Sequence, residues 1–238
     1  MKWIFPLCLV ALFGSSIARS EDKTLESVIE ARKAEFRAKA SPEKLAAYGE
    51  GIEAVRKARI VETALSKGAK APDFTLPSAT GAKVTLAEEL DKGPVVLTSY
   101  RGGWCPYCNI QLAAYQEILP QIEELGAQLI AISPEVPDQS LTTREKNELR
   151  FTVLSDQNLK VSGQYGLVFE LTPEVEKLYA EFFDIKEYNG EDAASNQLPL
   201  AATYVIDAKG KIAWSFLDAD YTKRAEPRDI IEALDELE

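Results

Sequence analysis

The sequence predicts an α/β fold, a mixed sheet with helices on both faces, preceded by a helical extension at the N-terminus. Apolar runs at residues 95–100 and 128–132 flank a segment with helical spacing of apolar residues, which is the order of a βαβ unit. Two strand-like runs at 203–207 and 212–216 flank a short turn, which is typical of an antiparallel hairpin. Residues 22–67 carry apolar residues at helical spacing.

The first twenty residues have the features of a signal peptide. Lys2 supplies a positive charge, residues 3–13 form an apolar run interrupted only by Pro6, and small residues up to Ser20 suit signal peptidase. Cys8 lies inside this run. The alternative, an uncleaved membrane anchor, would need an apolar run of ~20 residues. We therefore expect residues 1–20 to be removed and the mature chain to be exported, to the periplasm or out of the cell.

Residues 21–67 are predicted to form a helical extension of two helices. Ser41-Pro42 separates them, with serine as the N-cap and proline at the first helical position. Their apolar stripes are Leu25, Val28, Ile29 and Phe36 in the first helix, and Leu45, Tyr48, Ile52 and Val55 in the second. These stripes need a cover, either the main domain or a second subunit, so a homodimer through these helices is one of two alternatives.

Residues 68–238 are predicted to form the main domain, which begins where Lys67-Gly68-Ala-Lys-Ala-Pro72 changes the composition. Strands at 73–76 and 83–86 form a hairpin, and the buried run 95–100 leads into a helix that Gly126 ends. Further along, the expected helices and strands are 138–149 (helix), 151–154 (strand), 157–165 (helix), a helix capped at Thr172-Pro173, the hairpin 203–216, and a closing helix from Pro227.

The charge balance excludes two classes of partner. Removing residues 1–20 takes away two basic residues and no acidic one, so the net charge of −11 becomes about −13. A chain this acidic is repelled by nucleic acid and by anionic membrane surfaces. We therefore expect neither as a partner.

The candidate site is the pair Cys105 and Cys108 in Tyr100-Arg-Gly-Gly-Trp-Cys-Pro-Tyr-Cys-Asn109, in a chain with no histidine. A cysteine at the first turn of a helix faces unpaired backbone N–H groups and the positive end of the helix dipole, which favour the thiolate. A second cysteine three residues later lies on the same face and within reach of a disulfide. We expect Cys105 to be the exposed, attacking sulfur and Cys108 the more buried one. Arg101 either adds a positive charge beside the thiolate or faces outward.

Other uses of this motif lack support in the sequence. A structural zinc site needs four nitrogen or sulfur ligands, and no third one follows the pair. Haem attachment would need a histidine where Asn109 stands. A purely structural disulfide over three residues would constrain little of the unfolded chain. We therefore expect no cofactor and no metal, and a CxxC between a buried strand and a helix indicates a thioredoxin-like redox site.

Four segments in order along the chain resemble the peroxiredoxin-like branch of the alkyl hydroperoxide reductase/thiol-specific antioxidant (AhpC/TSA) family of the thioredoxin superfamily. They are Ala71-Pro-Asp-Phe-Thr-Leu76, Arg101-Gly-Gly-Trp-Cys-Pro-Tyr-Cys-Asn109, Leu198-Pro-Leu-Ala-Ala-Thr-Tyr-Val-Ile-Asp207 and Asp220-Tyr-Thr-Lys-Arg-Ala-Glu-Pro227. Ser133-Pro134 and Leu154-Ser-Asp156 are similar to the bacterioferritin-comigratory type. The resemblance implies a thioredoxin-like domain over 68–238, with Cys105 as the peroxidatic cysteine and Cys108 as the resolving cysteine.

The chain departs from the family pattern at two places. The proline and the threonine or serine that the family carries seven and three residues before the peroxidatic cysteine are replaced by Thr98 and Gly102. The position that faces the cysteine, arginine in peroxiredoxins and cis-proline in thioredoxins, is Ala201, with Pro199 two residues earlier. These departures predict a slow reaction with peroxide.

The sequence leads to a thiol-dependent peroxidase that reduces hydrogen peroxide or organic hydroperoxides and is reset by a thioredoxin-like protein or another dithiol. The alternative is a thiol–disulfide oxidoreductase that uses the same pair, since Cys-Pro-Tyr-Cys also resembles the glutaredoxin tetrapeptide. A second alternative is a non-enzymatic, redox-sensitive binding module.

Overall fold

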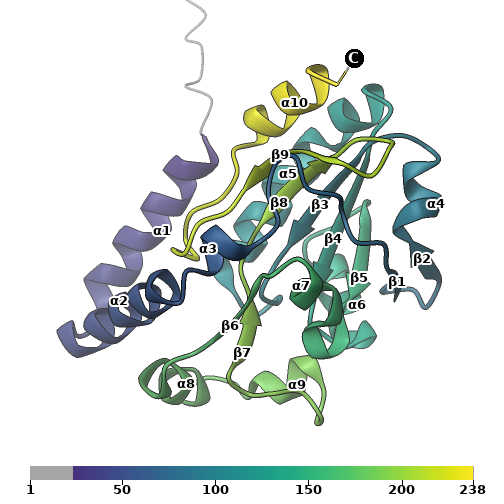
Figure 1. The fold of residues 1–238 in the computed structure, drawn as a ribbon. Coiled ribbons are helices and arrows are strands. Elements are labelled where there is room, and N and C mark those ends of the chain that lie inside the picture. Colours follow the sequence, from purple (N-terminus) through teal and green to yellow (C-terminus); the bar gives the residue numbers. More distant parts are fainter. Residues whose placement is uncertain (1–23, 238) are drawn as a thin grey trace, which may run out of the picture.

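A five-stranded sheet lies at the centre of the structure, a computed structural model that describes residues 24–237 (Figure 1). In spatial order its strands are β5 (Thr152–Ser155), β4 (Gln128–Ser133), β3 (Val95–Ser99), β8 (Thr203–Ile206) and β9 (Ile212–Phe216). The first three run parallel, whereas β8 and β9 are antiparallel to their neighbours. The sheet is mixed, as predicted, and every residue of the central strand β3 is buried.

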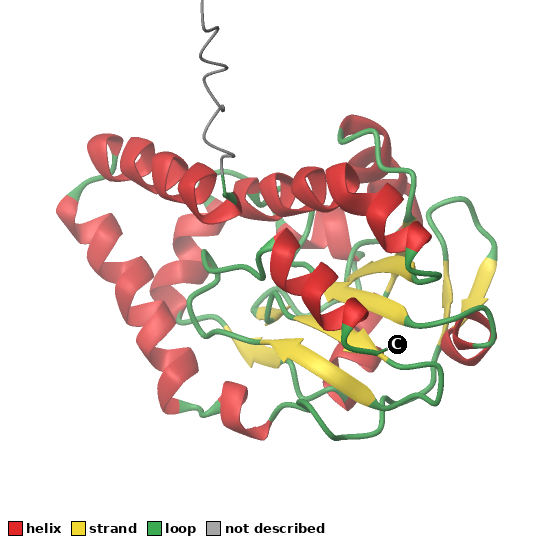
Figure 2. Cartoon of the chain, turned by 90° about the horizontal axis from the view of Figure 1, so that it is seen from above, coloured by secondary structure: helices red, strands yellow, loops and turns green. Residues whose placement is uncertain are grey.

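Each face of the sheet carries its own hydrophobic core. Successive side chains of a strand point to opposite faces, so Val95 and Leu97 join one core and Val96 joins the other. The first core is closed by the second half of the N-terminal extension and by residues 161–185, and the second core by helices that follow the cysteine pair and end the chain. Figure 2 shows helices on more than one side of the strands. The prediction of helices on both faces is confirmed.

Helix α5 (Pro106–Glu124) connects β3 to the parallel strand β4 and completes the predicted βαβ unit. Pro106 occupies the first helical turn, where no backbone N–H is needed. The helix buries Leu112, Tyr115 and Ile122 against the sheet. Gly126 follows it with a φ of 66°, which only glycine adopts without strain. The cysteine pair is thereby fixed at the junction of the central strand and its crossover helix.

The N-terminal extension consists of α1 (Leu25–Lys39), α2 (Pro42–Lys57) and the short α3 (Ile60–Thr63). Ser41 is the N-cap of α2, as predicted, and its hydroxyl accepts from the backbone N–H of Lys44 at 3.3 Å. Helix α1 packs on α5, and α2 packs on α8 (Pro173–Ala180). The same chain therefore covers part of each apolar stripe, while Val28 stays 38% exposed.

The remaining elements follow the predicted order with local differences. They are the hairpin of β1 (Thr75–Pro77) and β2 (Lys83–Thr85), α4 (Leu86–Leu90), α6 (Pro137–Lys146), η1 (Gln157–Leu159), α7 (Lys160–Gln164), β6 (Val168–Glu170), α9 (Ile185–Asn189), β7 (Gln197–Pro199) and α10 (Pro227–Asp235). Leu86, which the sequence pattern predicts at the end of a strand, begins α4 instead. The pairing of β6 with β7 was not predicted, because three-residue strands are too short for a periodic pattern.

The structure does not test two of the expectations. The predicted signal peptide, with Cys8, falls outside the described residues. The boundary between residues 67 and 68 stays a prediction. Within residues 24–237, no helix has both the length and the apolar character that a membrane crossing requires.

Candidate active site

Cys105 and Cys108 lie at the start of α5, where the sequence predicted them. Cys105 is the N-cap residue, and its carbonyl accepts from the backbone N–H of Cys108 at 3.1 Å. Both are free thiols. The expected exposure of Cys105 is wrong, because its exposed fraction is 1% and that of Cys108 is 0%. Aromatic side chains from distant segments cover this end of the sheet, and local sequence gives no sign of them.

A guanidinium group lies beside the first sulfur. Nη1 of Arg101 is 3.9 Å from Sγ of Cys105, and Nη2 donates to the hydroxyl of Tyr179. The Arg101 side chain is also stacked against aromatic rings, with the guanidinium 5.0 Å from the ring of Trp104 and 4.4 Å from that of Tyr221. Its exposed fraction is 2%, so of the two orientations left open for Arg101 the inward one is correct. Arginine keeps its charge throughout the accessible pH range.

A second guanidinium group lies beside the other sulfur. Nη2 of Arg224 is 3.6 Å from Sγ of Cys108, and Nη1 donates to the carbonyls of Tyr221 and Lys223. The sequence analysis gave this arginine no role, although it lies in the segment 220–227 that carries a family resemblance. Each cysteine thus has its own buried cation.

The surroundings separate the two pKa values. Burial alone would raise the pKa of Cys105, but a hydrogen bond from Cys108 and the positive charges of Arg101 and Arg224 outweigh it and bring this pKa below its ordinary value. Burial raises the pKa of Cys108, and the hydrogen bond and negative charge of Cys105 raise it further. Cys105 is therefore the thiolate of the pair, and Cys108 is the thiol.

The two glycines before the pair are required by close contacts. A Cβ at Gly102, where φ is 149°, would lie 2.3 Å from Nε1 of Trp104. A Cβ at Gly103 would lie 2.0 Å from Oγ1 of Thr143. The carbonyl of Gly103 accepts from Nδ2 of Asn109 at 2.8 Å, which ties the loop to the first turn of α5. The loop is thus held on both sides by packed neighbours.

Glu135 also holds the loop that carries Gly103, and no local motif in the sequence points to this residue. Its carboxylate is fully buried and accepts from the backbone N–H of Gly103 at 2.8 Å and from the hydroxyl of Tyr100 at 3.0 Å. The hydroxyls of Ser133 and Thr143 donate to it at 3.3 and 3.2 Å. Burial raises the pKa of Glu135, and these hydrogen bonds oppose the rise. Four donors compensate a carboxylate that has no ion-pair partner within residues 24–237.

Aromatic side chains close the site. The ring of Trp104 stacks on Phe183 with centroids 4.7 Å apart and lies 5.4 Å from the ring of Tyr179. Beside Arg101 is a cavity of about 20 Å³, large enough for a water-sized molecule. Its walls include Arg101, the tyrosine rings of residues 179 and 221, and Ile52 and Val55 of α2. The helical extension therefore forms part of the site's enclosure.

Of the positions that depart from the family pattern, Gly102 packs against Trp104, and Thr98 and Ala201 are buried. The hydroxyl of Thr98 donates to the carbonyl of Ala202 at 3.3 Å and lies 3.1 Å from Oγ1 of Thr203, inside the sheet. Ala201 is buried two residues before β8, and Pro199 ends β7. Positive charge at the sulfurs comes from Arg101 and Arg224 instead. The slow reaction with peroxide stays a prediction.

Comparisons with known proteins point in one direction. The family model described as AhpC/TSA family matches residues 67–215. Peroxiredoxin Q, chloroplastic, of Oryza sativa subsp. japonica is 34% identical over 158 residues, which are 66% of this chain and 62% of that protein. Peroxiredoxin Bcp of Escherichia coli (strain K12) is 29% identical over 154 residues, 65% of this chain and 86% of that protein. Among solved structures, peroxidoxin BcpB from Mycobacterium tuberculosis matches with a TM-score of 0.57 at 21% identity, over 73% of this chain and 99% of that one.

Proposed function

Because the chain belongs to the AhpC/TSA family, we propose that Cys105 is its peroxidatic cysteine and Cys108 its resolving cysteine. The chain is a peroxide-reducing thiol peroxidase of the Bcp/PrxQ type of peroxiredoxin, and it has a thioredoxin-like fold. The observation that carries the assignment is the guanidinium of Arg101, which lies 3.9 Å from Sγ of Cys105 in a buried site. A cation at this distance favours the thiolate, which is the nucleophile.

In the first step the Cys105 thiolate attacks an oxygen of the peroxide, ROOH. A bond forms between sulfur and that oxygen while the O–O bond breaks, and the departing RO⁻ takes a proton to become ROH. Cys105 is oxidised to a sulfenic acid and the peroxide is reduced. Arg101 stabilises the thiolate before the attack and faces the negative charge as it moves to the oxygen.

In the second step the sulfur of Cys108 attacks the sulfur of the sulfenic acid. The S–S bond forms, the S–O bond breaks, and the oxygen leaves as water with the proton of Cys108. The two cysteines are one helical turn apart, so the helix need not unwind for the disulfide to form. A thiol reductant then returns the pair to two thiols by exchange, and we propose a thioredoxin-like dithiol protein for this role.

The test compares three chains that begin at residue 21: the wild type, Cys105→Ser and Cys108→Ser. Each receives hydrogen peroxide or cumene hydroperoxide with a dithiol, and dimedone traps sulfenic acid for mass spectrometry. We expect Cys105→Ser to lose peroxide consumption and Cys108→Ser to accumulate a dimedone adduct on Cys105. The assignment is refuted if Cys105→Ser consumes peroxide as fast as the wild type. A mixed disulfide on Cys105 of Cys108→Ser, formed from a disulfide substrate in the absence of peroxide and not accompanied by a dimedone adduct when peroxide is given, would indicate disulfide exchange instead.

We also propose that residues 1–20 direct export and are then removed. The apolar run and the small residues up to Ser20 support this. The N-terminal sequence of the protein recovered from the cell envelope fraction tests the proposal, and an intact Met1 would contradict it.

A homodimer through the N-terminal helices is the remaining part of the proposal. Val28 of α1 is exposed and lines a groove with Ile118 of α5 and Ile231 of α10. A groove that combines these apolar residues with charged ones such as Glu117 and Arg228 supports an interface. Analytical ultracentrifugation of the wild type and Val28→Glu tests it, and a monomeric wild type would rule it out.

A further inference from the structure

The segment 218–227 contacts the second sulfur, and the peroxide step gives it no role. We infer that Arg224 is a catalytic residue for the other half of the cycle, where it stabilises negative charge on the sulfur of Cys108. It acts when Cys108 attacks the sulfenic acid and again when Cys108 leaves during reduction of the disulfide. The inference rests on the proposed roles of Cys105 and Cys108.

Contacts within residues 221–224 hold the guanidinium of Arg224 beside the sulfur of Cys108. Nη2 lies 3.6 Å from Sγ of Cys108, while Nη1 donates to the carbonyls of Tyr221 and Lys223. Arg224 is 6% exposed, and its Nε has no hydrogen-bond partner within residues 24–237. A buried guanidinium that leaves a donor unpaired is costly to keep. Its position is therefore explained by the sulfur that it faces.

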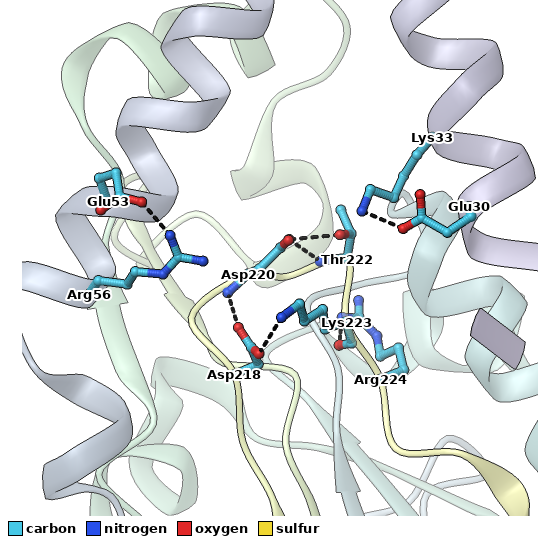
Figure 3. A network of polar contacts seen from close by, with 9 residues as sticks. All are labelled: Glu30, Lys33, Glu53, Arg56, Asp218, Asp220, Thr222, Lys223 and Arg224. Atoms are coloured by element: carbon cyan, nitrogen blue, oxygen red, sulfur yellow. Dashed lines mark hydrogen bonds and ion pairs between the residues drawn. The ribbon is translucent and has the colours of Figure 1, made fainter. Parts of the chain in front are cut away.

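The backbone around Arg224 is fixed by side chains of the same segment. Oδ1 of Asp220 accepts from the backbone N–H of Thr222 at 2.9 Å and from its hydroxyl at 2.7 Å, and Oδ1 of Asp218 accepts from the backbone N–H of Asp220 at 2.8 Å. Figure 3 shows this network between the helices that carry Glu30 and Glu53. These local bonds hold the guanidinium in one place while the sulfur changes its oxidation state.

The two arginines divide the chemistry between the two sulfurs. Arg101 faces Cys105 at 3.9 Å, and Arg224 faces Cys108 at 3.6 Å. Both pairs are buried, so solvent and salt screen them little. The charged groups that act on Cys108 are these two arginines and the thiolate of Cys105.

This arrangement orders the two steps in time. Before peroxide reacts, burial and the Cys105 thiolate keep the pKa of Cys108 high, so Cys108 holds its proton. Formation of the sulfenic acid converts the thiolate to a neutral group and removes that repulsion. The two cations remain, and they now favour loss of the proton from Cys108. The resolving sulfur thus becomes a nucleophile when its target has formed.

The same cation serves the reduction. A thiolate of the reductant attacks the sulfur of Cys105, a new S–S bond forms, and the bond between Cys105 and Cys108 breaks. Cys108 leaves as a thiolate beside Arg224, and a lower pKa of the leaving thiol speeds this exchange. The second thiol of the reductant then releases the Cys105 thiolate beside Arg101, and the two electrons of the reductant have reached the pair.

The test follows a single turnover with hydrogen peroxide and no reductant in the wild type, Arg224→Gln, Arg224→Lys and the control Arg228→Gln, whose side chain is 79% exposed. Dimedone quenching at set times gives the rates at which the sulfenic acid forms and disappears. Removing a cation at this distance shifts a pKa by about 1–3 units, so we expect the sulfenic acid of Arg224→Gln to disappear about 10-fold or more slowly. Its formation should change by less than about 3-fold, because Arg101 remains. Arg224→Lys should recover part of the loss, and Arg228→Gln should match the wild type.

A second readout does not depend on turnover. In the Cys105→Ser background, ultraviolet absorbance of the thiolate gives the pKa of Cys108, and we expect Arg224→Gln to raise it by about 1–3 units. Arg224→Met serves the same purpose if the glutamine variant does not fold by circular dichroism.

Three results would overturn the inference: an unchanged lifetime of the sulfenic acid, an equal slowing of both steps, or an equal effect of Arg228→Gln. If the wild type forms no sulfenic acid at all, the proposed roles of the cysteines have failed. A normal wild-type turnover with an unaffected Arg224→Gln refutes the role of Arg224 alone.

Discussion

The substitution Arg101→Met removes the cation beside Cys105 and keeps an unbranched apolar stem in the buried position. Sulfur and guanidinium lie 3.9 Å apart, and both groups are buried. Without the cation, the thiolate loses a favourable interaction that the neutral thiol never had. We therefore expect the pKa of Cys105 to rise.

The distance sets the size of the rise. Two unit charges 3.9 Å apart attract each other by about 4 kcal/mol at an effective dielectric constant of about 20, which corresponds to about 3 pKa units. Single opposite charges at such distances shift pKa values in proteins by about 1–3 units. Arg224 remains in the variant and continues to favour the thiolate, so the expected rise is about 1–3 units.

The assay is the second-order rate of the reaction with hydrogen peroxide as a function of pH. The rate rises as Cys105 loses its proton, so the acid limb of the profile should move to higher pH by the shift in its pKa. Arg101→Lys keeps a charge and should move the limb less. Lys44→Met, which removes a cation that lies over the ring of Phe182, is the control and should not move it. An acid limb of Arg101→Met that coincides with that of the wild type would refute the reasoning.

Three further predictions concern the surroundings of the site. Gly103→Ala should lower the free energy of unfolding by about 1–3 kcal/mol, because the new Cβ would lie 2.0 Å from Oγ1 of Thr143. The control Gly49→Ala in α2 meets no atom within 4 Å and should raise the free energy of unfolding by up to about 1 kcal/mol. Urea unfolding measures both variants, and equal effects would contradict the clash at Gly103. The carboxylate of Glu226 accepts from the first two backbone N–H groups of α1 at 3.1 and 2.6 Å. Glu226→Gln should therefore lower the free energy of unfolding by about 0.5–2 kcal/mol and speed hydrogen exchange at the start of α1. Unchanged exchange would argue against this cap. Burial raises the pKa of Glu135 in the folded chain, so the folded state binds this proton more tightly than the unfolded state does. The free energy of unfolding of the wild type should therefore fall relative to that of Glu135→Gln as the pH rises above 4.5. A difference between the two that does not change with pH would contradict this.

The parts of the fold that depend on local pattern were predictable from the sequence. The βαβ unit around the cysteines, the hairpin of β8 and β9 and the N-cap at Ser41 all appear as expected. Each rests on residues within one or two turns or strands of one another, where periodicity and capping chemistry apply.

The enclosure of the site was not predictable, because it is made by contacts between distant segments. Arg224 is 116 residues from the cysteine that it faces, and Tyr179 is 78 residues from Arg101. No spacing rule connects residues so far apart. The burial of Cys105 has the same cause, since the covering rings belong to a segment whose placement depends on the whole fold. The motif therefore identified the reactive atoms but not the groups that tune them.

The burial of the two sulfurs sets a limit on turnover. Cys105 and Cys108 have almost no exposed surface, so a disulfide between them cannot be reached by another protein's thiolate in this conformation. Each cycle with such a reductant must therefore include an opening of the aromatic cover, and that opening caps the rate however reactive the disulfide is. A small-molecule thiol needs a narrower opening, so the ratio of the two turnover rates measures how far the cover has to move.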